Sequence, residues 1–158
     1  MKKICFVTTV YMTYKCFLKQ LSQYLYESGE YDISLICNNE EDALKDIPSF
    51  VHYHPVDMKR GVSLSAFGAI KKIGEILERE IFDIVQYSTP NAAFYASIAA
   101  KKKKVPVRLY CQWGIRYMGF EGWKRSVFKH LEKKTCDNST FIEAESHNIR
   151  NFSLDEKL

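Results

Sequence analysis

The sequence predicts an α/β protein with a doubly wound, mostly parallel sheet of about six strands and helices on both faces of that sheet. Short apolar runs alternate with segments of helical periodicity along the whole chain. The segments between the runs have about 10 to 17 residues, enough for the helical crossovers that parallel strands need. The chain has 158 residues, 46% of them hydrophobic, which is enough for one sizeable core. We therefore expect one domain over residues 1–158.

The first half of the chain predicts a strand, a helix and two further strands. Residues 4–7 form a continuously apolar run, which indicates a strand that is buried on both faces. Residues 17–29 carry a helical stripe that ends in a glycine, the residue favoured just past the end of a helix. Strands are expected at residues 32–37 and 51–56, and the acidic residues 40–50 between them are expected to be irregular.

The second half continues the alternation. Thr89 and Pro90 predict a helix start, because a capping hydroxyl is followed by proline at the first helical position. The lysine run at residues 101–104 puts cations at the end of that helix, where they complement its dipole. Further helices are expected at residues 63–80, opened by Ser63 or Ser65, and at 123–131, and strands at residues 82–87, 107–111 and 140–144.

The sequence has no sign of export or of a membrane span. No apolar run reaches the roughly 18 residues that a spanning helix needs. The apolar run near the N-terminus is too short for a secretory signal. The five cysteines are an odd, scattered set without a Cys-x-x-Cys pair, which fits reduced thiols. We therefore expect a cytoplasmic protein.

Positive charge is concentrated in the C-terminal part of the chain. Residues 1–100 have a net charge of −2, whereas residues 101–158 have a net charge of +6. Such a region suits a phosphate-bearing ligand, nucleic acid or an anionic membrane surface, and we expect peripheral association with the inner membrane face. The aromatic and basic residues of the segment 110–125 fit either core packing or a surface that stacks on a ligand and binds phosphate. Nucleic acid is not among the expected partners.

Common cofactor and metal signatures are absent. The loop at residues 8–15 has no glycine, which argues against a dinucleotide site, and no Walker-type lysine motif occurs. Cys111 and Arg116 stand one residue too close together for a phosphatase loop. His52 and His54 share one face of a strand, but no third ligand stands at a typical spacing. We therefore expect no metal site and no cofactor.

Ligands of doubly wound sheets bind beyond the carboxyl ends of the strands, so the loops at residues 8–16, 57–63, 86–91, 112–122 and 144–148 are the expected place of function. The loop after the first strand has hydroxyls and backbone amides that can bind a ligand. The loop after the fourth strand leads into a helix N-terminus, and the loop after the fifth strand carries the planar, charged guanidinium of Arg116. We expect these groups to converge on one cleft. The alternative is that Thr89 and Asn91 cap their helix and that Arg116 makes a surface ion pair. The candidate substrate-binding residues on these grounds are Thr8, Thr9, Tyr11, Ser88, Thr89, Asn91 and Arg116.

Several segments together carry a family resemblance. These are residues 2–9, 17–33, 82–90, 105–108, 113–125 and 131–133, with Ser146 after the last strand. In order and spacing they resemble the N-terminal, acceptor-side half of retaining, family 4-like GT-B glycosyltransferases of surface and capsular polysaccharide synthesis. No single motif carries this resemblance alone.

The resemblance implies two Rossmann-like domains, of which the N-terminal one binds the acceptor and the C-terminal one holds most of the nucleotide-sugar. Residues 153–156 form a capping box that should open a helix, yet only two residues follow, so we expect the donor-binding domain to be absent from this chain. Family members commonly carry His where this chain has Gln112 and Trp113, and also in the stretch 86–88. Gln112 and Trp113 therefore join the candidate substrate-binding residues, and the catalytic base stays unassigned.

The function expected on this basis is that of an acceptor-binding domain of a retaining glycosyltransferase. It would take part in transferring a sugar from a nucleotide-sugar to a lipid-linked or saccharide acceptor, and it would be inactive in isolation. One alternative is a non-catalytic binding module, or the acceptor half of a transferase split over two polypeptides, with a separate donor subunit as partner. Another is a Rossmann-like nucleotide-binding domain of unrelated chemistry.

Overall fold

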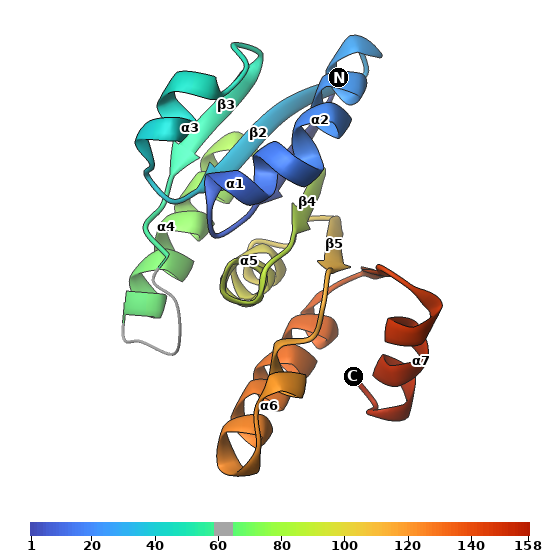
Figure 1. Cartoon of the computed structure of the whole chain (residues 1–158). Coiled ribbons are helices and arrows are strands. Elements are labelled where there is room, and N and C mark those ends of the chain that lie inside the picture. Colours follow the sequence, from blue (N-terminus) through green and yellow to red (C-terminus); the bar gives the residue numbers. More distant parts are fainter. Residues whose placement is uncertain (59–64) are drawn as a thin grey trace.

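The computed structural model of the chain describes residues 1–58 and 65–158 (Figure 1). Its described strands form one sheet in the order β3-β2-β1-β4-β5-β6, and all neighbouring pairs are parallel. The doubly wound α/β fold predicted from the sequence is thereby confirmed. The strands are β1 (Lys2–Val7), β2 (Tyr31–Cys37), β3 (Val51–Pro55), β4 (Ile84–Tyr87), β5 (Val107–Gln112) and β6 (Phe141–Ala144).

Helices cover both faces of this sheet, as expected. One core cluster joins Cys5 and Val7 of β1 to buried residues of α4, α5 and α6. The other joins Ile4 and Phe6 of the same strand to the helices that follow β1 and β2. Alternate residues of β1 thus face opposite clusters, which explains why the strand reads as a continuous apolar run. The helical elements are α1 (Tyr11–Thr13), the π-helix η1 (Tyr14–Leu18), α2 (Lys19–Glu27), α3 (Glu41–Asp46), α4 (Ser65–Glu80), α5 (Pro90–Lys102), the 3-10 helix η2 (Arg116–Gly119), α6 (Gly122–Asn138) and α7 (His147–Asp155).

The first helical segment begins earlier than predicted. It starts at Tyr11, and its buried side chains are Tyr11, Tyr14 and Leu18, whereas Phe17 is 65% exposed. The spacing of the three buried residues is helical, but two of them are tyrosines, so the more apolar stripe from Phe17 predicts a later start. Residues 11–16 are therefore helix and not loop.

Two further expectations are wrong. The acidic segment 40–50 contains the short helix α3, which a sequence pattern cannot show because only Ala43 of that helix is buried. Residues 153–156 do not open a helix: the cap is Ser146, whose Oγ accepts a hydrogen bond from the backbone N–H of Ile149, and α7 already ends at Asp155. The alternative helix start at Ser63 lies outside the described residues, as do residues 59–63 of the expected functional loop.

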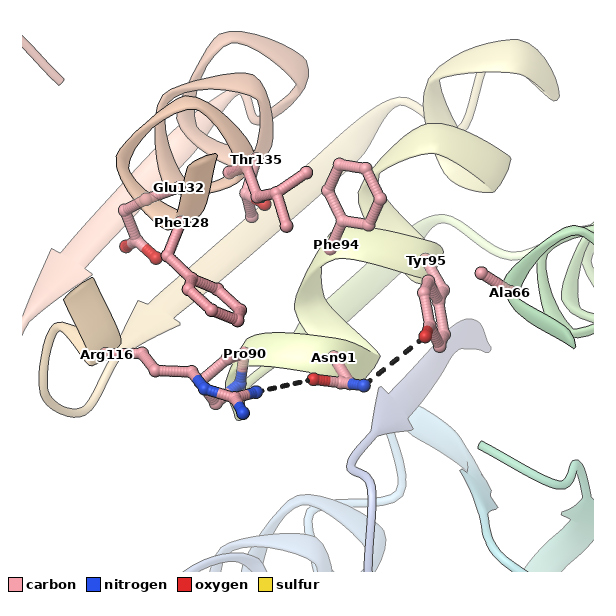
Figure 2. Close-up of a pocket in the computed structure, with 10 residues that line it drawn as sticks. Ala66, Pro90, Asn91, Phe94, Tyr95, Arg116, Phe128, Glu132 and Thr135 are labelled. Carbon is pink, nitrogen blue, oxygen red and sulfur yellow. Dashed lines mark hydrogen bonds between the residues drawn. The ribbon is translucent and has the colours of Figure 1, made fainter. Parts of the chain in front are cut away.

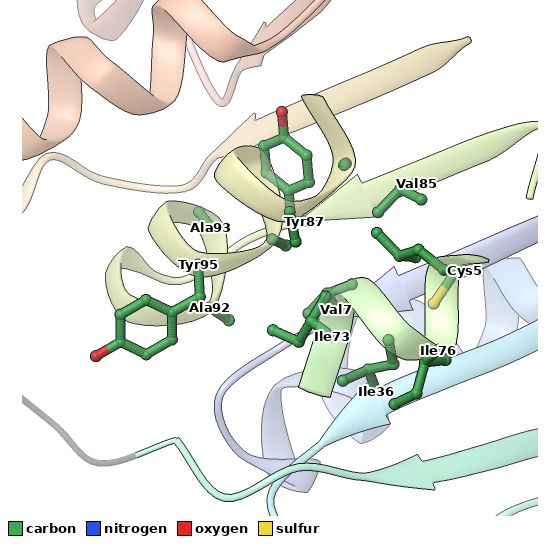
Figure 3. Close-up of a cluster of buried hydrophobic side chains, with 14 of the residues drawn as sticks. Cys5, Val7, Ile36, Ile73, Ile76, Val85, Tyr87, Ala92, Ala93 and Tyr95 are labelled. Carbon is green, nitrogen blue, oxygen red and sulfur yellow. The ribbon is translucent and has the colours of Figure 1, made fainter. Parts of the chain in front are cut away.

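Helix α5 lies at the centre of the larger core cluster (Figure 3). All its buried residues except Tyr95 are small, and the helix packs against β1, β4 and the neighbouring helices α4 and α6. Small side chains let the helix axis come close to the sheet, so the N-terminus of α5 is held firmly beside the end of β4. The buried small residues are Ala92, Ala93, Ala96, Ser97, Ala99 and Ala100.

We expect Ala96→Leu to destabilise the protein by about 1–3 kcal/mol or more, because the added carbons have no space at a position with 0% exposure. Lys102→Leu, at an exposed position of the same helix, should change stability by less than about 0.5 kcal/mol. Urea denaturation of the two variants and the wild type checks this. Equal stability of Ala96→Leu and the wild type would contradict the close packing of α5.

Candidate functional site

A cleft of about 340 Å³ opens where the winding of the sheet reverses, between the ends of β1 and β4. The chain leaves β1 toward β2 on one side and leaves β4 toward β5 on the other, so the two connecting loops diverge and leave a crevice at the carboxyl edge. The cleft is lined by Thr9, Val10, Thr13, Thr89, Pro90, Asn91 and Arg116. Four of the nine predicted site residues, Thr9, Thr89, Asn91 and Arg116, therefore lie together.

Thr9 and Thr89 join the two loops directly. The backbone N–H of Thr9 donates to Oγ1 of Thr89 at 3.1 Å, and the two hydroxyl oxygens are 2.8 Å apart. The φ of Thr89 is +64°, a strained conformation for a β-branched residue. Its side chain makes no capping hydrogen bond to α5, so the prediction of a hydroxyl cap is wrong. The hydroxyl instead connects β4 to β1 across the cleft floor.

Arg116 reaches the cleft from the loop after β5. Gly114 has a φ of +91°, a conformation that only glycine adopts easily, and it turns the chain after the strand. Ile115 and Tyr117 are buried and anchor the loop on either side of Arg116. The sequence thus fixes the backbone so that the half-buried arginine points back toward α5.

The guanidinium of Arg116 is held by one hydrogen bond and by aromatic rings (Figure 2). Its Nη1 donates to Oδ1 of Asn91 at 2.9 Å, and its Cζ lies 4.6 Å from the ring centre of Phe128. Phe128 in turn stacks on Phe120 with ring centres 4.7 Å apart. No ion pair found within the described chain includes Arg116, so the predicted alternative of a surface ion pair does not apply.

A small apolar pocket of about 60 Å³ adjoins the cleft. It shares Pro90, Asn91 and Arg116 with the cleft, and Figure 2 shows its lining side chains from α5 and α6 around the arginine. The carboxylate of Glu132 is the one acidic group among its described lining residues. The remaining lining residues are Ala66, Phe94, Tyr95, Phe128, Leu131 and Thr135.

Gln112 lies outside the cleft and connects three elements. Its Nε2 donates to Oε1 of Glu132 at 2.8 Å, and its Oε1 accepts from the hydroxyl of Ser153 at 2.8 Å. The hydroxyl of Tyr110 donates to the same Glu132 oxygen at 2.7 Å. Burial raises the pKa of Glu132, and the hydrogen bonds from Gln112 and Tyr110 oppose that shift. Gln112 also lines a larger pocket of about 500 Å³ beside β6 and α7.

The other predicted residues do not line the cleft. The hydroxyl of Thr8 donates to the carbonyl of Val10 at 3.1 Å. The hydroxyl of Tyr11 donates to Asp46 at 3.2 Å, and burial raises its pKa. Ser88 is buried, and its hydroxyl has no partner among the described residues. Trp113 packs on Phe17 with ring centres 5.1 Å apart. A role in substrate binding stays a prediction for all nine residues.

Several residues of the site are not among those predicted from the sequence. Thr13 could have been found as a hydroxyl in the first turn after β1, had the helix been started at Tyr11. Glu132 and Phe128 lie on α6 and meet the cleft region only through tertiary packing, so no local pattern points to them. Within residues 1–58 and 65–158, no group of three or more His, Cys, Asp or Glu could hold a metal ion. No helix of the same residues is long and apolar enough to cross a membrane.

The sequence matches a family model described as glycosyl transferase 4-like over residues 3–146. A comparison with curated proteins gives no match. Similar solved structures include the UDP-N-acetylglucosamine 2-epimerases of Rickettsia bellii (20% identity, TM-score 0.72) and Methanocaldococcus jannaschii (18%, 0.69) and MurG of Acinetobacter baumannii (11%, 0.62). The match covers 100% of this chain for both epimerases and 94% for MurG. This chain spans only 42% of the length of the R. bellii epimerase, 43% of the M. jannaschii epimerase and 42% of MurG. At these identities the likeness shows the fold alone.

We expect Gly114→Ala to destabilise the protein by at least about 1 kcal/mol, because a Cβ at a positive φ strains the backbone even in open space. The matched control is Gly68→Ala in α4, where a Cβ also meets nothing within 4 Å but the backbone is helical. That change should stabilise the protein by about 0.5–1 kcal/mol. Thermal or urea unfolding measures the change in stability of each variant, which should be negative for Gly114→Ala and positive for Gly68→Ala. Changes of the same sign would contradict the turn assigned to Gly114.

The raised pKa of Glu132 predicts a pH dependence of stability. A carboxyl group whose pKa is higher in the folded state stabilises the fold at low pH, and this stabilisation is lost as pH rises through the raised value. Glu132→Gln removes the titrating group, so the free energy of unfolding of the variant relative to wild type should increase from about pH 4 upward. Urea titrations between acid and neutral pH measure the difference. Glu145→Gln, at an exposed position, is the control, and a difference that is flat with pH would contradict the burial of a titrating Glu132.

Proposed function

This chain belongs to the glycosyl transferase 4-like family, and on that basis we propose that it is the acceptor-binding domain of a retaining glycosyltransferase. The resemblance inferred from the sequence is confirmed for the family and the fold. The proposed reaction transfers a sugar from a nucleotide-sugar to a lipid-linked or saccharide acceptor in surface polysaccharide synthesis. The nucleotide-sugar is a substrate, and no cofactor is proposed.

The observation that carries the proposal is the cleft at the switch point between β1 and β4. It presents the hydroxyls of Thr9, Thr13 and Thr89 and the guanidinium of Arg116 to one space. Hydroxyl groups can both donate and accept, which suits the hydroxyls of a sugar or a polyol acceptor. Because this space is at the carboxyl edge of the sheet, an acceptor bound there faces away from the core, toward a donor-binding domain placed against that edge.

The cleft supplies binding and orientation rather than acid–base chemistry. None of its described lining residues is a carboxylate or an imidazole. In this proposal, the proton that the acceptor hydroxyl loses passes to a group on the donor side of the site. In this proposal, the chain holds the acceptor so that one hydroxyl is oriented toward the sugar, and the partner is a donor domain or a separate donor subunit.

We expect this chain alone not to transfer sugar, because it provides the acceptor side of the site only. The measurement is turnover of common nucleotide-sugars with lipid-linked acceptors by the purified 158-residue chain and by the chain joined to a donor-binding domain. Transfer should require the second domain. Turnover by the isolated chain would sink the proposal that its site is incomplete.

We also propose that the protein works at the cytoplasmic face of a membrane, held there by charge. All five cysteines are free, which fits a reducing compartment. On α6, Trp123 is 72% exposed, and the Nζ of Lys124 lies 5.9 Å from its ring centre. An exposed aromatic ring beside basic side chains suits a lipid headgroup region.

Binding to anionic vesicles should therefore be weak and sensitive to salt, with each well-placed basic residue contributing on the order of 1 kcal/mol. Cosedimentation with anionic and neutral vesicles at low and high ionic strength measures it. Trp123→Ala and Lys124→Gln should each reduce the bound fraction, whereas Lys71→Gln, on α4, should not. Equal sedimentation with both kinds of vesicle at low salt would overturn the membrane proposal.

A further inference from the structure

Arg116 is an uncompensated charge in the cleft. It is the only charged residue among the described lining residues, and no carboxylate of the described chain pairs with it. On α6, by contrast, Arg125 and Lys129 each have an acidic partner, the shared carboxylate of Glu156. The cleft therefore presents a net positive charge that the fold itself does not balance.

The guanidinium is also fixed in position before any ligand arrives. Its face rests on Phe128, and one of its five N–H groups donates to Asn91. Among the contacts of the described chain, the other N–H groups of Arg116 have no acceptor. A planar, preoriented fork with free donors is the group that best matches an oxyanion such as phosphate, because it can form two parallel charge-assisted hydrogen bonds.

Neutral donors and a helix dipole surround the same space. The hydroxyls of Thr9, Thr13 and Thr89 line the cleft beside the N-terminus of α5, a helix of 13 residues. Pro90 and Asn91, the first residues of α5, line the cleft, so the positive end of the helix dipole lies beside it. These groups add to the attraction of Arg116 for an anion and do not oppose it.

The adjoining pocket has the opposite character. Phe94, Phe128 and Leu131 give it apolar walls, Glu132 and Thr135 also line it, and its volume of about 60 Å³ leaves room for a few carbon atoms. Pro90, Asn91 and Arg116 border both spaces. A ligand whose anionic group lies on Arg116 can thus place an attached hydrocarbon against the rings of the adjoining pocket.

We propose that the acceptor of this site is a phosphate-bearing amphiphile, with its phosphate on Arg116 and the first carbons of its apolar chain in the adjoining pocket. The inference rests on the proposed function of the cleft as the acceptor site, and it selects the lipid-linked class over a neutral saccharide. A neutral sugar would leave the guanidinium without a counter-charge, whereas a phosphate group satisfies it. Charge-assisted hydrogen bonds are roughly twice as strong as neutral ones.

The test is calorimetric or NMR titration of the 158-residue protein with three probes: geranyl phosphate, geraniol and inorganic phosphate. Geranyl phosphate contains both groups, and each of the other two contains one. We expect geranyl phosphate to bind most tightly. Arg116→Gln should weaken the binding of geranyl phosphate by roughly tenfold or more, because it removes one to two charge-assisted hydrogen bonds. Leu131→Gln should weaken the binding of geranyl phosphate and leave the binding of inorganic phosphate unchanged.

Lys102→Gln is the matched control, because it removes one positive charge at the exposed C-terminal end of the helix whose N-terminus borders the cleft. Circular dichroism and urea unfolding of each variant show whether it is folded. The proposal is overturned if geraniol binds as tightly as geranyl phosphate, if Lys102→Gln loses as much affinity as Arg116→Gln, or if no probe binds the folded wild type. If inorganic phosphate binds as tightly as geranyl phosphate, the proposed role of the apolar pocket is wrong.

The proposed function and this inference fail in different ways. If the chain joined to its donor domain glycosylates neutral saccharides and ignores phosphorylated lipids, the acceptor role holds and the phosphate inference is wrong. If geranyl phosphate binds through Arg116 but no acceptor is ever glycosylated, the anion site holds and the transferase role is wrong.

Discussion

The reversal of winding at β1 is the constraint on which the rest of the structure depends. Strands β1 and β4 are adjacent and parallel, and Val7 pairs with Tyr87. The residues two positions after this pair therefore lie side by side. Those residues are Thr9 and Thr89, which bond to each other across the gap. A shift of one residue in this register would separate them, so the floor of the cleft follows from the pairing of two strands far apart in sequence.

The arginine side of the cleft depends on a different set of contacts, at the C-terminal end of the chain. The loop that carries Arg116 is fixed by Tyr117, whose hydroxyl donates to Glu156 at 3.3 Å and whose ring lies near Phe152 of α7. Lys129 hydrogen-bonds to Glu156 and thereby holds its pKa below the usual range. Gln112 and Ser153 add a second connection from β5 to α7. The cleft thus has two sides: the loops after β1 and β4 form one, and the segment after β5 that carries Arg116, itself held against α6 and α7 (Figure 1), forms the other.

The sequence could predict the parts of the site that follow from fold geometry. The carboxyl-edge rule placed Thr9, Thr89, Asn91 and Arg116 together, since it needs only the strand ends. It could not predict that the hydroxyl of Thr89 turns from its helix to Thr9, because that depends on a φ of +64°. Nor could it predict the bond between Gln112 and Glu132, which lie twenty residues apart and meet through the packing of α6. The two wrong expectations at α3 and α7 share one cause: short helices with one buried residue or none have no periodic signal.

The net charge of the C-terminal part and the charge at the cleft also have different consequences. The net +6 of residues 101–158 suggests a broad basic surface, but several of its cations are paired in the fold: Lys103 with Glu78, Lys129 and Arg125 with Glu156, and Lys133 with Asp137. Exposed pairs of this kind are screened and contribute little at a distance. Arg116 differs because its stacking on Phe128 half-buries it, and a charge in a partly desolvated position interacts more strongly with a ligand at contact range. An anion is therefore selected at the cleft by one prepositioned arginine and its neutral neighbours, and far less by the net charge of the domain.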